Sequence, residues 1–213
     1  ILTLNDDTVV HRDFVQRLLV SASMHPRSII GSICLSYEDE TTVFEGAVYV
    51  NWLTAKYHYP DTGKAYAAVM RSRFTSRTFL QRSDFVSGRG TLIPVEAFRD
   101  VGLYNHADLP HHGADYEFSR RACLKGYELL IDYRAVLWGH VEFSGIKSRK
   151  MKSGWLALLK SFFSFKSPNN LKYRLIFARL CSVDGRFLLF YICDVCRLII
   201  GAFVGNTRVF LKG

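Results

Sequence analysis

The chain has 213 residues, of which 49% are hydrophobic and 22% are charged, a composition that is ordinary for a globular protein and excludes disorder along its whole length. Its 28 Lys and Arg against 19 Asp and Glu give a formal net charge of +9, which favours an anionic partner such as a phosphate-bearing ligand, an acidic membrane surface or a nucleic acid. The five cysteines have no disulfide-framework spacing, so a reducing compartment such as the cytoplasm is favoured.

An acidic run follows the first predicted strand. Residues 1–4 are mostly apolar and predict a buried strand of a parallel sheet, and Asn5, Asp6 and Asp7 come directly after it. Ligands of such sheets collect at the carboxyl ends of the strands. Acidic residues also cap helices, here one that would begin near Val10, so these residues alone leave a ligand-binding and a capping role open.

The first third of the chain predicts one helix and one strand. Apolar residues recur at helical spacing from Phe14 and stop near Pro26, and residues 29–35 predict the next strand. Residues 36–83 show no clear period and are interpreted as an insertion of loops and short strands. The amino end has neither an initiator Met nor the features of a signal peptide, and because it opens within a strand we expect upstream structure to be missing.

The middle of the chain predicts short strands and two helices. The expected strands are residues 84–87, 91–93, 129–131 and 135–137, and the expected helices are residues 94–101 and 116–124. Gly102 and Gly126 follow the two helices in the position that glycine commonly takes after a last turn.

The last part of the chain is basic and helical. Three helices are predicted at 152–165, 169–181 and 184–204. The last of them contains a mostly apolar run, 187–204, that is interrupted by Asp194 and Arg197. Two central charges are costly inside a bilayer, so a helix that lies on a membrane surface or in a bundle is favoured over one that spans the membrane.

Four motifs occur in order: LNDD at 4–7, SGRGTLIP at 87–94, HHGADYEFSRRA at 111–122 and WGH at 138–140. Together they resemble the family 2 glycosyltransferases of the GT-A fold, particularly the bacterial rhamnosyltransferase-like branch. The resemblance implies an α/β fold in which residues 1–145 form the C-terminal part of a Rossmann-like GT-A domain with a mixed sheet. The family's N-terminal nucleotide-binding half would be missing, and residues 146–213 would form an α-helical C-terminal extension.

The resemblance assigns the first acidic motif to a metal and a donor. In the family an Asp-x-Asp or Asn-x-Asp motif holds a divalent cation that bridges the diphosphate of a nucleotide sugar. The match implies that Asp7 binds Mg²⁺ or Mn²⁺, while Asn5 and Asp6 orient ribose, phosphate or metal-bound water. The chemistry is reasonable because a leaving diphosphate gathers negative charge that a cation can neutralise.

The second acidic motif of the family is usually Glu-Asp-x-Asp, and Ala114 stands here in place of its first Glu. Asp115 matches the residue that acts as the general base, which would take the proton of the acceptor hydroxyl during in-line attack and so invert the anomeric centre. The alternative is that Asp115 is the N-cap of the helix that follows, and both roles can hold together. His111 and His112 are interpreted at most as lining of the acceptor site.

The resemblance assigns two further features to the donor. Gly88, Arg89 and Gly90 match the segment between donor and acceptor, where glycines let the backbone approach a ligand and Arg89 neutralises phosphate. An ordinary turn is the alternative. His140 follows the last core strand, where the family often places a histidine near the diphosphate or the metal, and a structural histidine is the alternative there.

The sequence therefore predicts an inverting, metal-dependent glycosyltransferase that moves a hexosyl or deoxyhexosyl group from a nucleotide-diphosphate sugar to a glycan or lipid-linked acceptor, in cell-surface polysaccharide synthesis. Its basic helices would hold it at the anionic inner face of the cell membrane as a cytoplasmic, peripheral protein. A non-catalytic, membrane-associated or partner-binding remnant of such an enzyme is one alternative. A nucleic-acid partner is not expected, because no helix-turn-helix, zinc or RNP-like motif is present.

Overall fold

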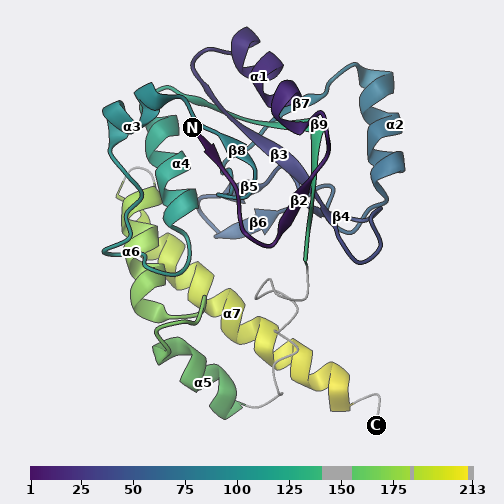
Figure 1. Cartoon of the computed structure of the whole chain (residues 1–213). Coiled ribbons are helices and arrows are strands. Elements are labelled where there is room, and N and C mark those ends of the chain that lie inside the picture. The colour runs from purple at the N-terminus through teal and green to yellow at the C-terminus, as the bar shows by residue number, and fades with distance from the viewer. Residues whose placement is uncertain (141–154, 183–184, 211–213) are drawn as a thin grey trace.

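The computed structural model describes residues 1–140, 155–182 and 185–210. Residues 1–140 form an α/β unit around a seven-stranded mixed sheet, and three helices follow beside it (Figure 1). This agrees with the expected α/β domain and its helical extension. The expected boundary between residues 145 and 146 lies outside the described residues.

The sheet combines one parallel pair with antiparallel neighbours. Its spatial order is β1-β8-β3-β9-β2, with β4 paired to β3 and β7 paired to β9. Only the β3–β9 pair is parallel among the described strands. A separate hairpin is made by β5 and β6. The strands are β1 (Leu2–Thr3), β2 (Thr8–Val10), β3 (Ser28–Ser36), β4 (Val43–Glu45), β5 (Tyr49–Asn51), β6 (Lys56–His58), β7 (Leu80–Arg82), β8 (Thr91–Leu92) and β9 (Glu128–Gly139).

Helices cover both faces of the sheet. On β3, Ile30 and Cys34 pack with Phe14 and Leu18 of α1, whereas Ile33 on the other face packs in the cluster that includes α3 and α4. This alternation is the period of two that a strand imposes on its side chains. The helices are α1 (Phe14–Met24), α2 (Tyr66–Ser76), α3 (Val95–Val101), α4 (Ala114–Leu124), α5 (Trp155–Phe163), α6 (Leu171–Cys181) and α7 (Phe187–Phe210).

Two expectations for the amino end are wrong. β1 is an edge strand paired antiparallel with β8, and Ile1 and Leu4 are 56% and 48% exposed, so the first strand is not buried in a parallel sheet. No helix begins near Val10, because residues 8–10 form β2 and pair with the end of β9. The acidic run therefore lies in the turn between two strands.

Three further differences concern element type. Residues 84–87 are not a strand, and helix α2 lies within the segment that was interpreted as loops and short strands. Only Val69 of α2 is buried, so this helix has almost no apolar face to mark it in the sequence. The strands expected at 129–131 and 135–137 are one strand, β9, whose pairing with β3 shifts between Ser32 and Ile33.

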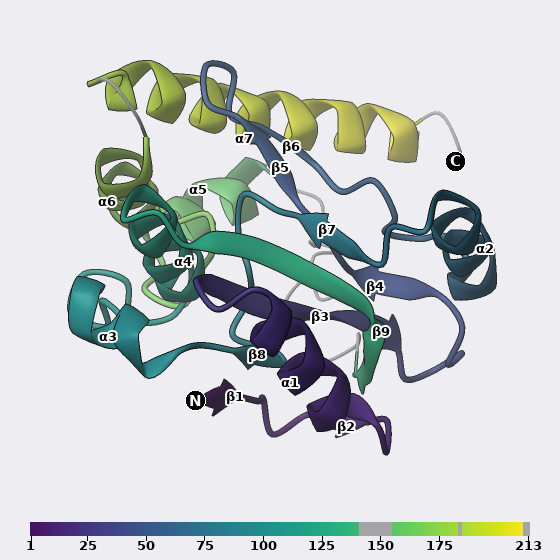
Figure 2. The same ribbon diagram turned by 90° about the horizontal axis from the view of Figure 1, so that it is seen from above.

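The C-terminal helices are packed onto the α/β unit. Phe190 of α7 and Ala178 of α6 are buried in one cluster with Phe85 and Val48. Seen from above, α7 runs along the β5–β6 hairpin, on the opposite side of the sheet from α1 (Figure 2). Within the described part of the chain, no helix combines the length and the apolar character that crossing a membrane requires.

Candidate functional site

Asp7 lies in the turn between β1 and β2. Asn5 and Asp6 of the same turn are exposed, whereas Asp7 is partly buried. The Oδ2 atom of Asp7 lies 3.8 Å from Nη2 of Arg89, and its Oδ1 atom is buried without a hydrogen-bond partner among the described residues. A buried carboxylate oxygen without a partner is costly, so Asp7 fits a role in which a cation supplies the missing contact.

His140 is brought to Asp7 by strand pairing. Because Thr8 pairs with Gly139, the backbone N–H of His140 donates to the carbonyl oxygen of Asp7 at 3.4 Å. The imidazole lies against the ring of Tyr37, with 4.1 Å between the ring centroids. The two residues expected to bind a metal are therefore neighbours in space.

Asp7 and His140 can hold a divalent cation only together with a ligand. The described residues contain no group of three or more His, Cys, Asp or Glu side chains that could hold a metal ion by themselves. Mg²⁺ and Mn²⁺ bound to nucleotides often take one or two protein ligands, with phosphate oxygens and water in the other positions. The unpartnered Oδ1 of Asp7 fits that incomplete protein shell, and the backbone contact places His140 next to Asp7 in the fold.

Arg89 places a buried positive charge beside this pair. Its side chain is 11% exposed and its guanidinium lies over the ring of Phe44. Burial opposes the charge, but the carboxylates of Glu45 and Asp7 favour it, and the pKa of Arg89 is raised. A Cβ atom at Gly139 would lie 2.8 Å from the guanidinium, so the glycine of the WGH motif makes room for it.

Glu45 was not expected from the sequence. It ends β4, where burial raises the pKa of its carboxyl group and the negative charge of Asp115 raises it further, against the positive charge of Arg89 and a hydrogen bond from Ser87. Glu45 lies in residues 36–83, where the apolar residues follow neither a helical nor a strand period. The only sequence signal for a role in the site is that an acidic residue follows a short β-rich piece.

Asp115 lies in the first turn of α4. Its Oδ1 accepts a hydrogen bond from the backbone N–H of Tyr116 at 2.9 Å, and its Oδ2 accepts one from the N–H of Gly88 at 3.0 Å. Burial raises the pKa of its carboxyl group, although these bonds and the nearby His112 oppose the rise. The N-cap of α4 is Gly113, so the expectation that Asp115 is the N-cap is wrong.

The segment 87–90 connects the two carboxylates. Gly88 donates to Asp115, and the next residue, Arg89, faces Asp7. Gly90 has φ +70°, and a Cβ atom there would lie 2.3 Å from Cδ2 of Leu137, so close packing explains this glycine. The arrangement places the carboxylates of Asp7 and Asp115 on the two sides of one short segment.

Comparisons with known proteins identify the family and the fold. Residues 1–160 match the family described as Glycosyl transferase family group 2. The structure is similar to the crystal structure of GalNAc-T7 with UDP, GalNAc and Mn²⁺, with a TM-score of 0.50 and 16% identity over 68% of this chain. The matched part covers only 27% of that protein's chain, and the likeness shows the fold alone, the Rossmann-like GT-A fold with its mixed sheet. No curated protein matches the chain.

Proposed function

The chain belongs to glycosyl transferase family group 2, and on this premise we propose that it moves a sugar from a nucleotide-diphosphate donor to a hydroxyl group of a glycan or lipid-linked acceptor, with inversion of the anomeric centre. The observation that carries the proposal is the segment 87–90, which contacts Asp7 on one side and Asp115 on the other. A displacement of this kind needs a stabilised leaving group and a base, and the two carboxylates supply these separately.

On the donor side, Asp7 and His140 would hold Mg²⁺ or Mn²⁺, which when bound neutralises charge on the leaving diphosphate. Arg89 contributes a second positive charge that does not depend on the metal, because the pKa of its guanidinium is raised by neighbouring carboxylates. Asn5 and Asp6 are exposed in the same turn and can accept hydrogen bonds from ribose or from metal-bound water. The structural neighbour was solved with UDP and Mn²⁺, which supports a cation of this type.

On the acceptor side, Asp115 would accept the hydroxyl proton as the oxygen attacks. Two backbone N–H groups fix the direction of its carboxylate, and burial raises the pKa of that carboxyl group, which makes it a stronger base than an exposed aspartate. A single base and a single in-line attack invert the anomeric centre. The same geometry supports an active enzyme over a non-catalytic remnant.

The direct test of the donor proposal is isothermal titration of the full-length protein with UDP, dTDP and GDP, each with and without Mn²⁺. We expect one nucleotide to bind, and its affinity to fall when Mn²⁺ is left out. If none of the three nucleotides binds, the non-catalytic remnant is favoured. If nucleotide affinity is the same with and without Mn²⁺, the metal is removed from the proposal.

We also propose that the C-terminal helices hold the protein at an anionic membrane surface, in the cytoplasm and at the inner face of the cell membrane. Leu188, Ile192 and Ile200 are exposed along one side of α7, at intervals of four and eight residues. Exposed basic side chains stand on neighbouring segments, which suits anionic lipids. They are Lys160, Lys166, Lys172, Arg179 and Arg186.

Flotation with anionic vesicles tests this surface. The protein should float with vesicles that contain anionic lipid and remain at the bottom with neutral ones. Ile192→Glu should abolish flotation, because it places a charge in the apolar strip. Leu103→Glu is the matched control, since Leu103 is 75% exposed on the α/β unit and should leave flotation unchanged. Equal loss in both variants would contradict the proposed role of α7.

A further inference from the structure

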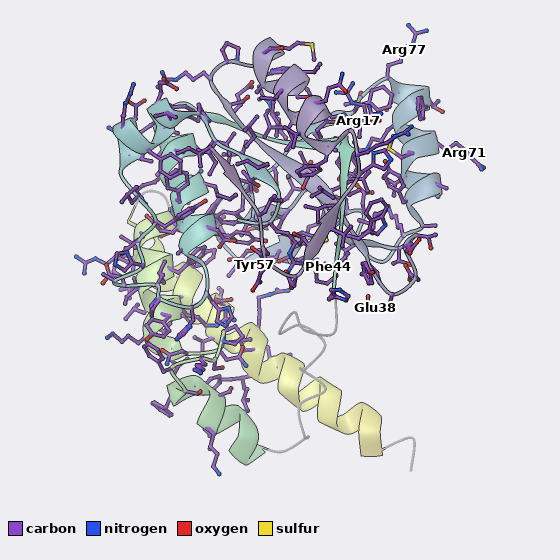
Figure 3. The ribbon with its side chains drawn as sticks, viewed as in Figure 1. Arg17, Glu38, Phe44, Tyr57, Arg71 and Arg77 are labelled. Atoms are coloured by element: carbon purple, nitrogen blue, oxygen red, sulfur yellow. The ribbon has the colours of Figure 1, made fainter. Side chains whose placement is uncertain are left out.

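A second feature lies beside Asp115, and it is a pocket of about 510 Å³. Its walls come from the β5–β6 hairpin, the N-terminal end of α4 and the helices α6 and α7. This volume falls within the range of sites that bind small ligands. Two views of the ribbon place α7 along the hairpin, and Figure 3 shows Tyr57 on the side of the sheet that faces α7.

Much of the pocket wall is not part of the segment shared with the family. Tyr173 and Arg174 of α6 and Asp194 and Arg197 of α7 all line the pocket, and all lie beyond the matched residues 1–160. The pocket is therefore a feature of this chain's helical extension as it packs on the α/β unit. A ligand bound here would also contact residues outside the segment that matches the family.

The aromatic side chains of the wall present flat faces. The ring of Tyr116 stacks on the fully buried Phe85, with 4.7 Å between centroids and 3° between planes. The rings of Tyr57 and Tyr59 are also nearly parallel, with 6.4 Å between centroids and 13° between planes. The apolar C–H face of a pyranose ring packs well against such surfaces, because it is flat and carries no group that must be hydrated.

Polar groups surround these rings. Arg174 and Asp194 form an ion pair, and the Nε atom of Arg174 is buried without a hydrogen-bond partner among the residues that the structure describes. Burial raises the pKa of Tyr57, and the charge of Asp194 raises it further, so its phenol keeps its proton and can donate. A guanidinium beside a carboxylate offers donors and acceptors to neighbouring hydroxyl groups.

The pocket reaches the start of α4, the helix that carries Asp115 in its first turn. Gly113 and Tyr116 line the pocket on the two sides of Asp115 in the sequence. Burial raises the pKa of Tyr116, and the charges of Glu45 and Asp115 act on the same group. A ligand that fills the pocket therefore contacts Gly113 and Tyr116, which stand on either side of Asp115 in the sequence.

We propose that this pocket binds the saccharide of the acceptor, with a sugar ring on the tyrosine faces and its hydroxyl groups on the Arg174–Asp194 pair. The inference rests on the proposed function, because it takes the bound saccharide to be the group that is glycosylated. A saccharide suits this wall better than a phosphate group does. The carboxylate of Asp194 repels an anion and already pairs with Arg174, whereas it can accept hydrogen bonds from sugar hydroxyls.

Saturation-transfer difference NMR on the full-length protein tests the pocket with four probes: the methyl glycosides of glucose, galactose, rhamnose and glucuronic acid. At least one probe should receive saturation on its ring protons. Tyr173→Ala and Arg197→Ala should each weaken that probe's binding about tenfold, which is the effect of losing one good contact. Arg197 is exposed, so its variant tests the pocket without a risk to folding. Arg99→Ala is the matched control, because Arg99 is exposed on α3 and does not line the pocket.

Competition decides between ligand classes. Displacement of the sugar by UDP with Mn²⁺ would make the pocket part of the donor site, and displacement by inorganic phosphate would make it an anion site. Either displacement overturns the proposal. It is also overturned if Tyr173→Ala and Arg197→Ala bind the sugar as well as the parent protein does, or if none of the four probes receives saturation. The two proposals fail separately: nucleotide binding without sugar binding removes only the acceptor pocket, while sugar binding without any nucleotide binding removes the glycosyltransferase proposal and leaves a saccharide site.

Discussion

Asp7 and Asp115 are two partly buried carboxylates held on either side of the segment 87–90, but in different ways. Asp7 faces the guanidinium of Arg89 and keeps one oxygen without a hydrogen-bond partner among the described residues. Asp115 accepts hydrogen bonds from two backbone N–H groups, and burial raises the pKa of its carboxyl group. A carboxylate that keeps one oxygen without a partner suits metal binding, whereas a buried carboxylate with a raised pKa suits proton transfer.

The segment 87–90 contacts the two carboxylates through different groups. Gly88 has room for a backbone hydrogen bond to Asp115, and the next side chain crosses to Asp7. The backbone of the segment contacts the proposed base, whereas the side chain of Arg89 contacts Asp7. The predictions below separate the two carboxylates experimentally.

The largest effect is expected from Asp115→Asn. The amide cannot accept the hydroxyl proton, so turnover should fall by about 10³-fold, within the usual range for loss of a general base. Donor affinity, measured by titration with nucleotide and Mn²⁺, should change little because Asp7 and Arg89 are intact. Asp108→Asn on the preceding exposed loop is the control and should retain full turnover. Near-normal turnover by Asp115→Asn would show that another group accepts the proton.

The next effect concerns the glycines that hold the segment in place. Gly90→Ala should destabilise the fold by about 3 kcal/mol, because φ is positive there and the new Cβ atom would collide with Leu137 and with Oγ of Ser32. Gly88→Ala should lower the free energy of unfolding by less, because the new Cβ atom would lie at an ordinary 3.9 Å from the Cβ atom of Asp115. Urea denaturation measures both variants, and equal losses would mean that packing does not distinguish the two positions.

Much of this geometry could be predicted from sequence because the four motifs each stand at an element boundary. Helix α1, strand β3 and the helices α3 and α4 were expected close to where they lie, since their apolar periods and terminal glycines are strong local signals. The resemblance implied that Asp7 and His140 serve one metal, but the pairing of β2 with β9 that brings their backbones into contact could not be foreseen.

The errors have physical reasons. Residues 1–4 are apolar yet lie at a sheet edge, because local hydrophobicity does not report which strands pair. Helix α2 has one buried residue and therefore no periodic pattern. Glu45 was missed because only the tertiary fold brings it to Arg89, and the pocket was missed because α6 and α7 complete it from a distant part of the sequence.

A smaller effect is expected at the metal carboxylate. Asp7→Ala should weaken Mn²⁺-dependent nucleotide binding by at least about tenfold, since it removes the oxygen that lacks a hydrogen-bond partner among the described residues. Asp6→Ala is the matched comparison, because Asp6 is the exposed neighbour in the same turn and should have a weaker effect on the metal dependence. Titrations at several Mn²⁺ concentrations measure both variants. An unchanged metal titration in Asp7→Ala would remove this residue from the cation site.

The smallest effect is on the pH dependence of stability, and it separates the two carboxylates without an activity assay. Because the pKa of Asp115 is raised in the folded state, the native protein holds more protons than the unfolded chain between the ordinary aspartate pKa of about 3.9 and the raised value. Stability contributed by this group is therefore present at acid pH and falls as pH rises through that window.

Asp115→Asn mimics the neutral acid. Its melting temperature should lie slightly above that of the parent protein at neutral pH, and the difference between the two should disappear below the ordinary aspartate pKa. Asp7→Asn should show no such gain, because it gives up the charge that faces Arg89. A pair of melting curves with the opposite order at neutral pH would mean that the hydrogen bonds from Gly88 and Tyr116 outweigh burial at Asp115.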